Sequence, residues 1–503
     1  MLRKIIWKPS IAGLACSLFI LMGGVAYSNQ TPRLAEEQTV IVQGELSEAS
    51  NKQIGKTDYH AVTANIAKSL KATNKVQQIY AAQQYRSMTD DPLEPQDYLT
   101  LLDAASLWEE TTGSDQVTVA VLDAGVAFEH EDLIDRWFIN EPEYGLTASE
   151  GSEPNCTSRG LELDKSCNNL DDSGNGLVDD WRGWDFANDD NDPAAGTTNP
   201  DGDAVSHGTA VTGMVGATGD NGVGVASVNW NTKILPIQIF NDDGGATTVE
   251  LAEGLAYAID MGVDVINMSL GTASEDPVIE SLLEDAQEAG IIVVAAAGNC
   301  GGTNYEDNGC TYRGQMLFPA TSELTIAVGG TDISDQQASF SSEGAMMDIA
   351  APATGNIRTT LYNQNDESGA YSGSISGTSF AAPIMSGMAA SLVGLLPEAE
   401  PQDIRSMLID STTKPSDMSG AAHTDKFGFG RLEPTDAVIL AQNCSQPRLS
   451  EDINCDGVVD LLDLSNLASQ WEIERTGRSD INGAGITDLL DLSLLASSWG
   501  ESL

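Results

Sequence analysis

The sequence has little positive charge. Its 503 residues include 24 Lys and Arg against 75 Asp and Glu, and the formal net charge is -51. Nucleic-acid binding depends on a basic surface that contacts phosphates, so this balance argues against a nucleic-acid partner. The acidic excess is explained either by solubility in salty surroundings or by carboxylates gathered for calcium. A chain of this length is expected to hold more than one domain, and 41% hydrophobic residues can form a substantial core.

Long hydrophobic runs are also rare. One run spans residues 11–26, follows a basic N-terminus and ends in small side chains. This is the pattern of a secretory signal. We therefore predict a signal peptide at 1–28 and a secreted protein, extracellular or associated with the cell surface; a retained membrane anchor is the alternative. No other stretch is apolar over enough residues to cross a bilayer, so we expect no stable membrane span after signal removal.

Cysteine is scarce and lacks the spacing of a metal site. One of the 7 cysteines lies in the predicted signal, and the rest form no CxxC pair or Cys/His cluster. The remaining even number in an exported chain suggests disulfides. Several connectivities are possible, and proximity along the chain favours the pairs Cys156–Cys167, Cys300–Cys310 and Cys444–Cys455.

Residues 29–94 are polar and rich in Gln and Ala, which suits a leader or propeptide. Their pattern is moderately helical from Ala61 to Gln84. If this segment is removed, we expect the cut near Gln84 to Asp91.

Continuous apolar runs then alternate with helical stretches. Such runs predict an α/β fold with a mostly parallel sheet covered by helices on both faces. Functional groups collect at the carboxyl ends of the strands in these folds, and Asp123 and Asn299 each follow a predicted strand. The apolar runs are 116–122, 232–239, 263–268, 291–297 and 324–328, and the helical stretches are 209–216, 248–261 and 278–289.

Ser379 opens an apolar, small-residue helix. Serine is a favoured N-cap, so a helix cap is the simplest interpretation. A cap does not require small residues on both sides or Pro383 four places on. These features make sense if a ligand must approach the Ser379 hydroxyl closely, which indicates a nucleophile.

Two more residues stand in tight glycine-bearing turns. Asp123 ends an apolar strand, and His207, one of 4 histidines, precedes a Gly-Thr helix start. An Asp, a His and a Ser fit the orienter, base and nucleophile of acyl-transfer catalysis. Their order along the chain is one of the known triad orders.

Together these segments resemble a subtilisin-family serine peptidase over residues 95–442. The resemblance implies that Ser379 attacks the scissile carbonyl, His207 transfers the proton and Asp123 orients the imidazole. It also implies that Asn299 donates to the oxyanion with the Ser379 N–H. The matching segments are VAVLDAG (119–125), HGTAVTGMVGA (207–217), NMSLG (267–271), AAAGN (295–299) and SGTSFAAP (376–383).

The same resemblance predicts the substrate-binding residues. Ser269, Leu270 and Gly271 match the segment that pairs with the substrate backbone as an added strand. Ala297 and Gly298 match the wall of the pocket for the residue before the cleaved bond, and their apolar, uncharged character suggests a preference for apolar side chains. The sequence departs from the family at Ala124, usually Ser or Thr, and at Ala210, often His.

An acidic segment at 171–180 resembles the start of a calcium loop. It alternates oxygen-bearing side chains around a glycine at the sixth position. The twelfth position is Arg182, so the pattern is incomplete, and a solvated acidic turn is the alternative. The predicted ligands are Asp171, Ser173, Asn175 and Asp179.

The C-terminal residues 452–471 recur as 480–499. Each copy has the oxygen pattern of a calcium loop and continues into an apolar helix, which predicts a small all-α duplicated calcium loop-helix module. The second copy lacks an oxygen at its fifth position. The predicted ligands are Asp452, Asn454, Asp456, Val458, Asp460 and Asp463 in the first copy, and Asp480, Asn482, Asp488 and Asp491 in the second.

This module, at 451–503 after a linker at 443–450, resembles a type I dockerin. That resemblance implies Ca²⁺ as cofactor and a cohesin-bearing scaffold or cell-surface protein as partner. The alternative is a calcium-stabilised tail that binds no cohesin.

Two functions follow from these patterns. The first is a secreted serine endopeptidase that hydrolyses peptide bonds and is tethered or stabilised by the C-terminal module. The second is a calcium-dependent adhesion or scaffold component that uses the peptidase fold only to bind peptides. The complete set of catalytic groups favours the first. The sequence does not distinguish a general degrader from a peptidase that matures one partner.

Overall fold

The computed structural model divides the chain into two compact units, Met1–Arg86 and Ser87–Leu503. The predicted boundaries of signal, leader, catalytic domain, linker and C-terminal module stay predictions. The structure describes residues 39–43, 52–53, 59–63, 78–81, 91, 93, 96–145, 165–195, 203–241, 244–362, 370–444, 452–453, 458–459, 461–469, 481 and 487–499.

The first unit contains a four-stranded antiparallel sheet in the order β2-β3-β1-β4. The helical pattern expected from Ala61 to Gln84 is wrong at residues 61–63 and 78–81, where strands form instead. β-branched and aromatic side chains favour strands. β1 also pairs with both β3 and β4, and pairing between segments distant in the sequence cannot be predicted from local periodicity. The strands are β1 (Thr39–Gln43), β2 (Lys52–Gln53), β3 (Tyr59–Thr63) and β4 (Gln78–Ala81).

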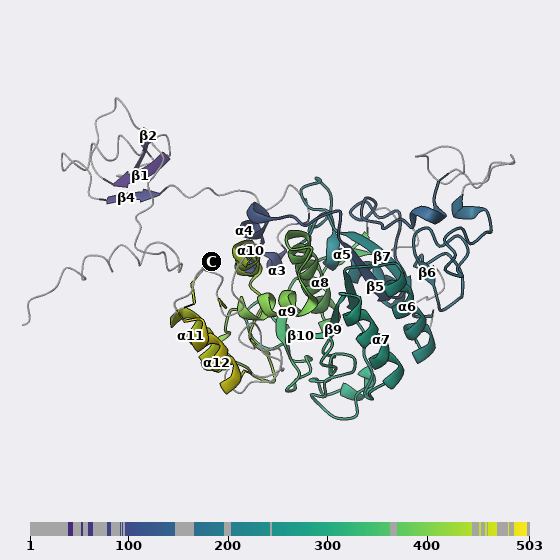
Figure 1. Cartoon of the computed structure of the whole chain (residues 1–503). Coiled ribbons are helices and arrows are strands. Elements are labelled where there is room, and N and C mark those ends of the chain that lie inside the picture. The colour runs from purple at the N-terminus through teal and green to yellow at the C-terminus, as the bar shows by residue number, and fades with distance from the viewer. Residues whose placement is uncertain are drawn as a thin grey trace, which may run out of the picture. The chain divides into compact units, whose positions relative to one another are not determined.

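The second unit is built on a seven-stranded sheet in the order β11-β10-β9-β8-β5-β7-β6 (Figure 1). Each neighbouring pair is parallel, which confirms the predicted fold class. The strands are β5 (Thr118–Asp123), β6 (Trp184–Asp185), β7 (Lys233–Gln238), β8 (Val265–Met268), β9 (Ile292–Ala296), β10 (Ile326–Thr331) and β11 (Ile349–Pro352).

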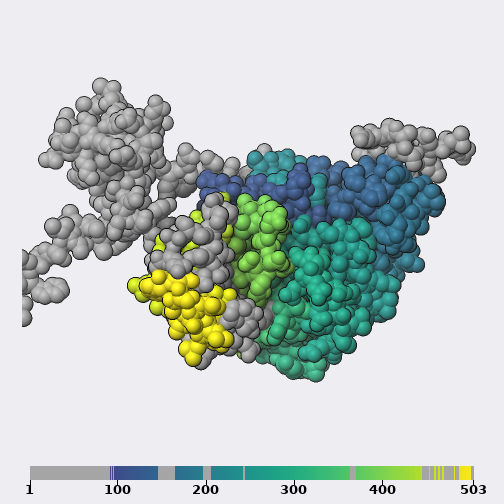
Figure 2. All heavy atoms as spheres, viewed as in Figure 1, coloured from purple at the N-terminus to yellow at the C-terminus, as the bar shows by residue number. Residues whose placement is uncertain are grey.

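Helices connect these strands and cover both faces of the sheet. The principal ones are α5 (Asp203–Gly216), α6 (Thr248–Asp260), α7 (Pro277–Glu288) and α8 (Thr378–Leu395). In the space-filling view, the teal atoms of the α6 and α7 region lie on the side of the second unit that faces the viewer (Figure 2).

Shorter elements complete the second unit. The shorter helices are α3 (Asp97–Leu101), α4 (Ala104–Glu110), α9 (Pro401–Asp410) and α10 (Pro434–Cys444). Single 3-10 turns are η2 (Glu141–Glu143), η3 (Lys165–Cys167), η4 (Tyr305–Asn308) and η5 (Ser416–Met418), and a small hairpin pairs β12 (Thr360–Leu361) with β13 (Ala370–Tyr371).

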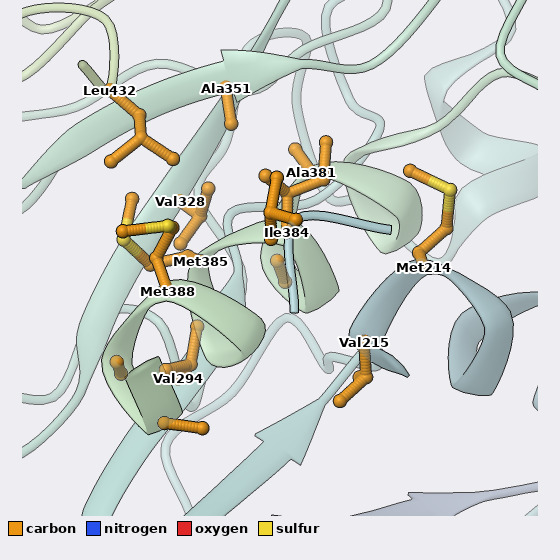
Figure 3. Close-up of a cluster of buried hydrophobic side chains, with 14 of the residues drawn as sticks. Met214, Val215, Val294, Val328, Ala351, Ala381, Ile384, Met385, Met388 and Leu432 are labelled. Atoms are coloured by element: carbon orange, nitrogen blue, oxygen red, sulfur yellow. The ribbon is translucent and has the colours of Figure 1, made fainter. Parts of the chain in front are cut away.

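Alternate residues of the central strand β5 belong to different cores. Val119 and Val121 join a cluster with side chains from α5 and α8, whereas Ala120 and Leu122 join one with α6 and α7. This follows from the two-residue period of a strand, whose successive side chains point to opposite faces. Figure 3 shows the first core, in which Ile384 and the methionines of α8 lie against Val294 and Val328 of the sheet.

Helix α8 is the central helix of that core. Within the described residues it is long and apolar enough to cross a membrane, but 78% of it is buried inside the body. Its apolar character is therefore explained by packing on the sheet.

A short N-terminal strap fastens the second unit at its start. The Asp91 carboxylate accepts the N–H groups of residues 220, 221 and 222. Leu93 N donates to Gly224 O at 3.1 Å. The Gln96 side chain donates to Ala226 O and accepts from Ala226 N. Asp91 and Gln96 are 3% and 1% exposed, so these bonds are made away from solvent.

Near the C-terminus, α11 (Leu461–Ser469) and α12 (Leu489–Ser497) pack against each other. They share a small apolar cluster of Ile453, Val459, Leu467 and Leu495. Asp488 caps α12 by accepting from Leu490 N, while Asp491 accepts from Asp488 N.

Candidate active site

The catalytic candidates lie where three elements of the second unit meet. Asp123 ends β5, His207 lies near the start of α5, and Ser379 is the second residue of α8. Gly208 allows α5 to approach the turn after β5 closely, because a Cβ there would lie 2.2 Å from the Gly125 carbonyl oxygen. The glycine beside His207 thus has a steric role that brings the imidazole to Asp123.

Asp123 and His207 form a pair in which the carboxylate is buried and the imidazole is partly exposed. The imidazole Nδ1 lies 2.8 Å from Asp123 Oδ1 and 3.0 Å from Oδ2. The Ala124 N–H also donates to Oδ1 at 2.8 Å. The side chains of Asp123 and His207 are 2% and 30% exposed, so the carboxylate is shielded while one side of the ring reaches solvent.

This pairing changes the basicity of His207. Burial lowers the pKa of the imidazole, but the charge of Asp123 and its hydrogen bond raise it, and the net pKa is above the ordinary histidine value. With Nδ1 donating to Asp123, the neutral ring has its lone pair on Nε2, where a base is needed.

Ser379 is close to His207 but bonds elsewhere. Its Oγ donates to the Ser269 carbonyl at 3.3 Å, and the Ser269 hydroxyl donates back to the Ser379 carbonyl at 2.8 Å. The ring of Phe380, the next residue, lies 5.7 Å from the His207 ring. Catalytic hydrogen bonds are often long or misaligned without substrate, so the bond of Ser379 to Ser269 does not argue against a catalytic bond to His207.

Asn299 is fixed beside the start of α8. Its Oδ1 accepts from Thr378 N at 3.0 Å and from Thr378 Oγ1 at 3.1 Å. Its Nδ2 lies on the side of Gly377, 3.6 Å from where a Cβ would stand. The amide is thus oriented with its oxygen engaged by Thr378 and its N–H₂ group on the side of Gly377, two residues before Ser379.

The predicted substrate-binding residues separate into two groups. Leu270 and Gly271 line a cavity of about 500 Å³ whose wall also includes Leu251, Ile279 and Phe318. Ser269 immediately precedes these two residues in the sequence and is hydrogen-bonded to Ser379. Ala297 and Gly298 are absent from the lining; Ala297 is fully buried in a core cluster, and its N–H and C=O bond to residues 328 and 317.

The acidic loop folds around its own oxygens. Asp171 accepts from the N–H groups of residues 174 and 176, the Ser173 hydroxyl accepts from Asn175 N, and Asn175 Oδ1 accepts from Leu177 N. Both oxygens of Asp179 accept the N–H of residue 169. Three of the four predicted ligands therefore belong to one tight turn, and Asp179 faces a different backbone group.

Glu143 is a site residue that sequence reasoning missed. It is 0% exposed, and its Oε1 accepts from Ser173 N in the acidic loop. Its Oε2 has no hydrogen-bond partner among the described residues. Burial raises the pKa of Glu143, and the charge of Asp180 adds to this. No spacing signal could have found it, because its place before the loop follows no calcium-loop pattern.

The described residues hold no group of three or more His, Cys, Asp or Glu side chains close enough to bind a metal ion. Calcium also binds neutral oxygens from Ser, Asn and backbone carbonyls. A calcium site at this loop would need such oxygens beside its carboxylates.

The C-terminal ligands are only partly described. Asp452, Asp463 and Asp491 are buried, and Val458 is exposed. The predicted ligands Asn454, Asp456, Asp460, Asp480 and Asn482 lie outside the described residues.

Cys300 and Cys310 are joined by a disulfide with a Cα–Cα distance of 5.9 Å. Cys167 and Cys444 are also disulfide-bonded. Cys156 and Cys455 lie outside the described residues, so the two pairings that involve them stay predictions.

Comparison with known proteins gives concordant results. A model of the "Subtilase family" matches residues 114–430. The chain is 32% identical over 286 residues to the "Thermophilic serine proteinase" of Bacillus sp. (strain AK1), covering 57% of this chain and 54% of that protein. It is 28% identical over 350 residues to the "Halolysin-like extracellular serine protease Nep" of Natrialba magadii, covering 69% and 52%. The chain spans about half the length of these curated relatives.

Two further matches cover more of the related protein. Subtilisin DY of Bacillus licheniformis is 35% identical over 215 residues, which are 43% of this chain and 73% of that protein. A solved protease structure from Pseudoalteromonas arctica superimposes with a TM-score of 0.51 at 26% identity, over 71% of this chain and 100% of that chain.

Proposed function

Because the chain belongs to the subtilase family, we propose that it is a secreted serine endopeptidase that cleaves protein or peptide substrates. The observation that carries this proposal is the hydrogen-bonded Asp123–His207 pair, whose imidazole lies 5.7 Å from the ring of Phe380, the residue after Ser379 at the start of α8. The relatives named as serine proteinases, one of them extracellular, support both the chemistry and the location.

The proposed reaction uses the three side chains in sequence. Ser379 Oγ attacks the scissile carbonyl while His207 Nε2 takes the hydroxyl proton, and His207 then gives that proton to the leaving amine. A water molecule repeats the two steps on the acyl-enzyme and regenerates Ser379. Asp123 keeps the proton on Nδ1 and stabilises the imidazolium that forms between the steps.

The negative charge on the substrate oxygen has two proposed donors. One is Asn299 Nδ2, which Thr378 orients by holding the amide oxygen. The other is the Ser379 N–H, one of the first N–H groups of α8, which have no partner within the helix. Donors fixed in advance cost no reorganisation when the charge develops, and the helix dipole acts in the same direction.

The substrate is proposed to lie along Ser269–Gly271 as an added strand. The cavity beside Leu270 has an apolar wall, with Glu275 and Asp276 also in its lining. An apolar substrate side chain would gain by leaving water there.

Hydrolysis of casein tests this proposal. Purified protein is expected to release peptides, and Ser379→Ala is expected to release none above background. The assay is run on chain whose leader has been removed, so that an inhibitory leader does not mask activity. No activity under these conditions would overturn the peptidase proposal and leave the alternative of an adhesion or scaffold component that only binds peptides.

Calcium is the cofactor proposed for the acidic loop and for the C-terminal repeats. In the acidic loop, the turn around Asp171, Ser173 and Asn175 supports it. In the repeats, the support is the duplicated oxygen pattern together with the buried carboxylates Asp463 and Asp491.

A cohesin-bearing protein is the partner proposed for the C-terminal module. The supporting observation is that Leu461 and Leu489, which occupy the same position in the two repeats, are 69% and 70% exposed. Exposed apolar side chains repeated at the starts of two helices suit a docking face.

Calorimetric titration of the full chain with purified cohesin domains tests this partner. Binding is expected only with calcium, and replacing both Leu461 and Leu489 by Asp is expected to abolish it. Val278→Asp, at an equally apolar side chain that is 51% exposed in α7, is the matched control. Absence of binding to every cohesin tried would favour a calcium-stabilised tail.

A further inference from the structure

Glu143 is a buried carboxylate with an unused oxygen. It ends the 3-10 turn η2 and is 0% exposed. Its Oε1 accepts from Ser173 N, across a separation of 30 residues, so the carboxylate lies against the acidic loop. Its Oε2 has no hydrogen-bond partner among the described residues. A buried charged group normally has a partner, because leaving it without one is costly.

A second buried carboxylate stands nearby. Asp180 is also 0% exposed and interacts electrostatically with Glu143. Its oxygens accept from the neutral side chains of Asn140, Asn175 and Tyr257, at 2.9, 2.8 and 2.8 Å. Among the ion pairs of the described residues, none joins Glu143 or Asp180 to a Lys or Arg. The negative charge of this pair therefore has no counterpart in that part of the chain.

The acidic loop lacks a carboxylate at its twelfth position, and Glu143 has a carboxylate next to the loop. A complete calcium loop of this type ends with a bidentate carboxylate at its twelfth position. Here that position is Arg182, whose guanidinium pairs with Asp192 at 3.3 Å and lies 3.8 Å from the centre of the Phe128 ring. The arginine is thus held away from the loop, and it has the wrong charge for a ligand.

We propose that Glu143 is a calcium ligand and supplies, from a separate turn of the chain, the carboxylate missing at the twelfth position of the acidic loop. This rests on the calcium proposed for that loop. The other oxygens would come from Asp171, Ser173 and Asn175 and from the carbonyl of Leu177. Each side-chain oxygen that already accepts one N–H has a second lone pair for a metal.

Asp180 is then a positioning residue. It accepts from Asn175 Nδ2 at 2.8 Å, which fixes which end of the amide is the oxygen available to the ion. Asp179 is not part of this ligand set: its two oxygens face the N–H of Asn169, which precedes the loop, whereas Asp171, Ser173 and Asn175 share one turn.

The test counts calcium ions and measures their affinity in the full chain by calorimetry. All proteins carry Ser379→Ala, so that self-digestion is excluded and the result is independent of peptidase activity. The variants are Glu143→Gln, Asp171→Asn and the combination of both. Glu141→Gln is the matched control, because Glu141 lies in the same turn as Glu143 and is exposed.

Glu143→Gln is expected to lose one bound calcium, or to bind it about a hundredfold more weakly, since affinity depends on the number of charged ligands. Asp171→Asn is expected to lose the same ion, and the double variant no more than either. Glu141→Gln is expected to bind as the parent does. Thermal unfolding with calcium and with chelator should give the same ranking.

Three results would overturn the inference. If Glu143→Gln keeps the parent's calcium number and affinity while Asp171→Asn loses an ion, the loop binds calcium without Glu143. If neither variant changes the count, the loop binds no calcium. If the parent gains no stability from calcium and Glu143→Gln unfolds at the parent's temperature, Glu143 carries a proton, since Gln reproduces the shape of the neutral acid.

Discussion

Asp123 and Glu143 are both buried carboxylates, and the chain provides for them in different ways. Asp123, at the carboxyl end of β5, has the Ala124 N–H and the His207 imidazole on its oxygens. Glu143, in the turn before the acidic segment, has an N–H donor on one oxygen and no partner on the other among the described residues. Asp123 is paired with His207, a side chain of the same chain that can accept a proton. For Glu143, we infer that a calcium ion from solution binds the second oxygen.

Of the variants considered, Asp123→Asn is expected to cause the largest loss of activity and to separate the role of Asp123 from that of Glu143. Asparagine keeps the shape but removes the charge that stabilises the imidazolium and selects the Nδ1–H tautomer, so kcat/KM should fall by about 10⁴. Measurement on a peptide substrate is paired with calorimetry, which should find the calcium number unchanged. Glu143→Gln should do the opposite, losing calcium and keeping kcat. Activity of Asp123→Asn within tenfold of the parent would contradict the triad.

Asn299→Ala is expected to cause the second-largest loss of activity. Loss of one oxyanion donor should lower kcat by about 10²–10³ with little change in KM, because the bond strengthens only as charge develops. The control is Asn304→Ala, an exposed asparagine a few residues further along. A change confined to KM would show that Asn299 binds substrate without serving the transition state.

The pH dependence of kcat/KM should report His207. The ring must be neutral to accept a proton, and its pKa is raised above the ordinary value of 6.5 because Asp123 outweighs burial. Activity should therefore fall about tenfold per unit below a midpoint that lies above 6.5. The linkage has a definite sign: the pair contributes stability below the unfolded-state pKa and loses it as pH rises through the folded one. A midpoint below 6.5 would contradict the assigned cause.

Calcium removal should have the smallest effect on turnover. The acidic loop adjoins the edge strand β6 rather than β5, so chelation well below the unfolding temperature should change kcat by less than about twofold. The unfolding temperature should fall by about 5 °C, since an ion at 100 times its Kd adds about 2.7 kcal/mol. Calorimetric scans and initial rates on the same samples check this. An immediate large loss of kcat would place a calcium ion at the catalytic groups.

Different parts of the fold differed in how far the sequence could predict them. The central strands were predictable because a parallel strand buried on both faces is a continuous apolar run; the run at 116–122 became β5 at Thr118–Asp123. The strands of the first unit were not, because β1 chooses β3 and β4 by long-range pairing. β6, only two residues long, has no detectable period.

The site shows the same division. The four catalytic candidates lie in short motifs that contain glycine and can be recognised in the sequence, and the structure gathers them around the start of α8. They are Asp123, His207, Ser379 and Asn299. Ala297 was expected in a pocket wall by resemblance; its side chain lies in a core cluster, and its substrate-binding role stays a prediction. Glu143 was missed because its relation to Ser173 exists only after η2 and the acidic loop have folded together. A hydrogen bond between two separately folded segments follows no fixed spacing in the sequence, so it cannot be predicted from a motif.

The strap at the start of the second unit limits how far the chain can be shortened from its N-terminal side. The carboxylate of Asp91 is the acceptor for three backbone N–H groups of the turn at 220–222, and Gln96 holds Ala226 by both of its backbone groups. Removal of the leader up to residue 90 takes none of these bonds away. Removal of Asp91 deprives three N–H donors of an acceptor that is 3% exposed. A truncation that keeps Asp91 therefore keeps all of these hydrogen bonds, whereas one that removes Asp91 loses three of them at once.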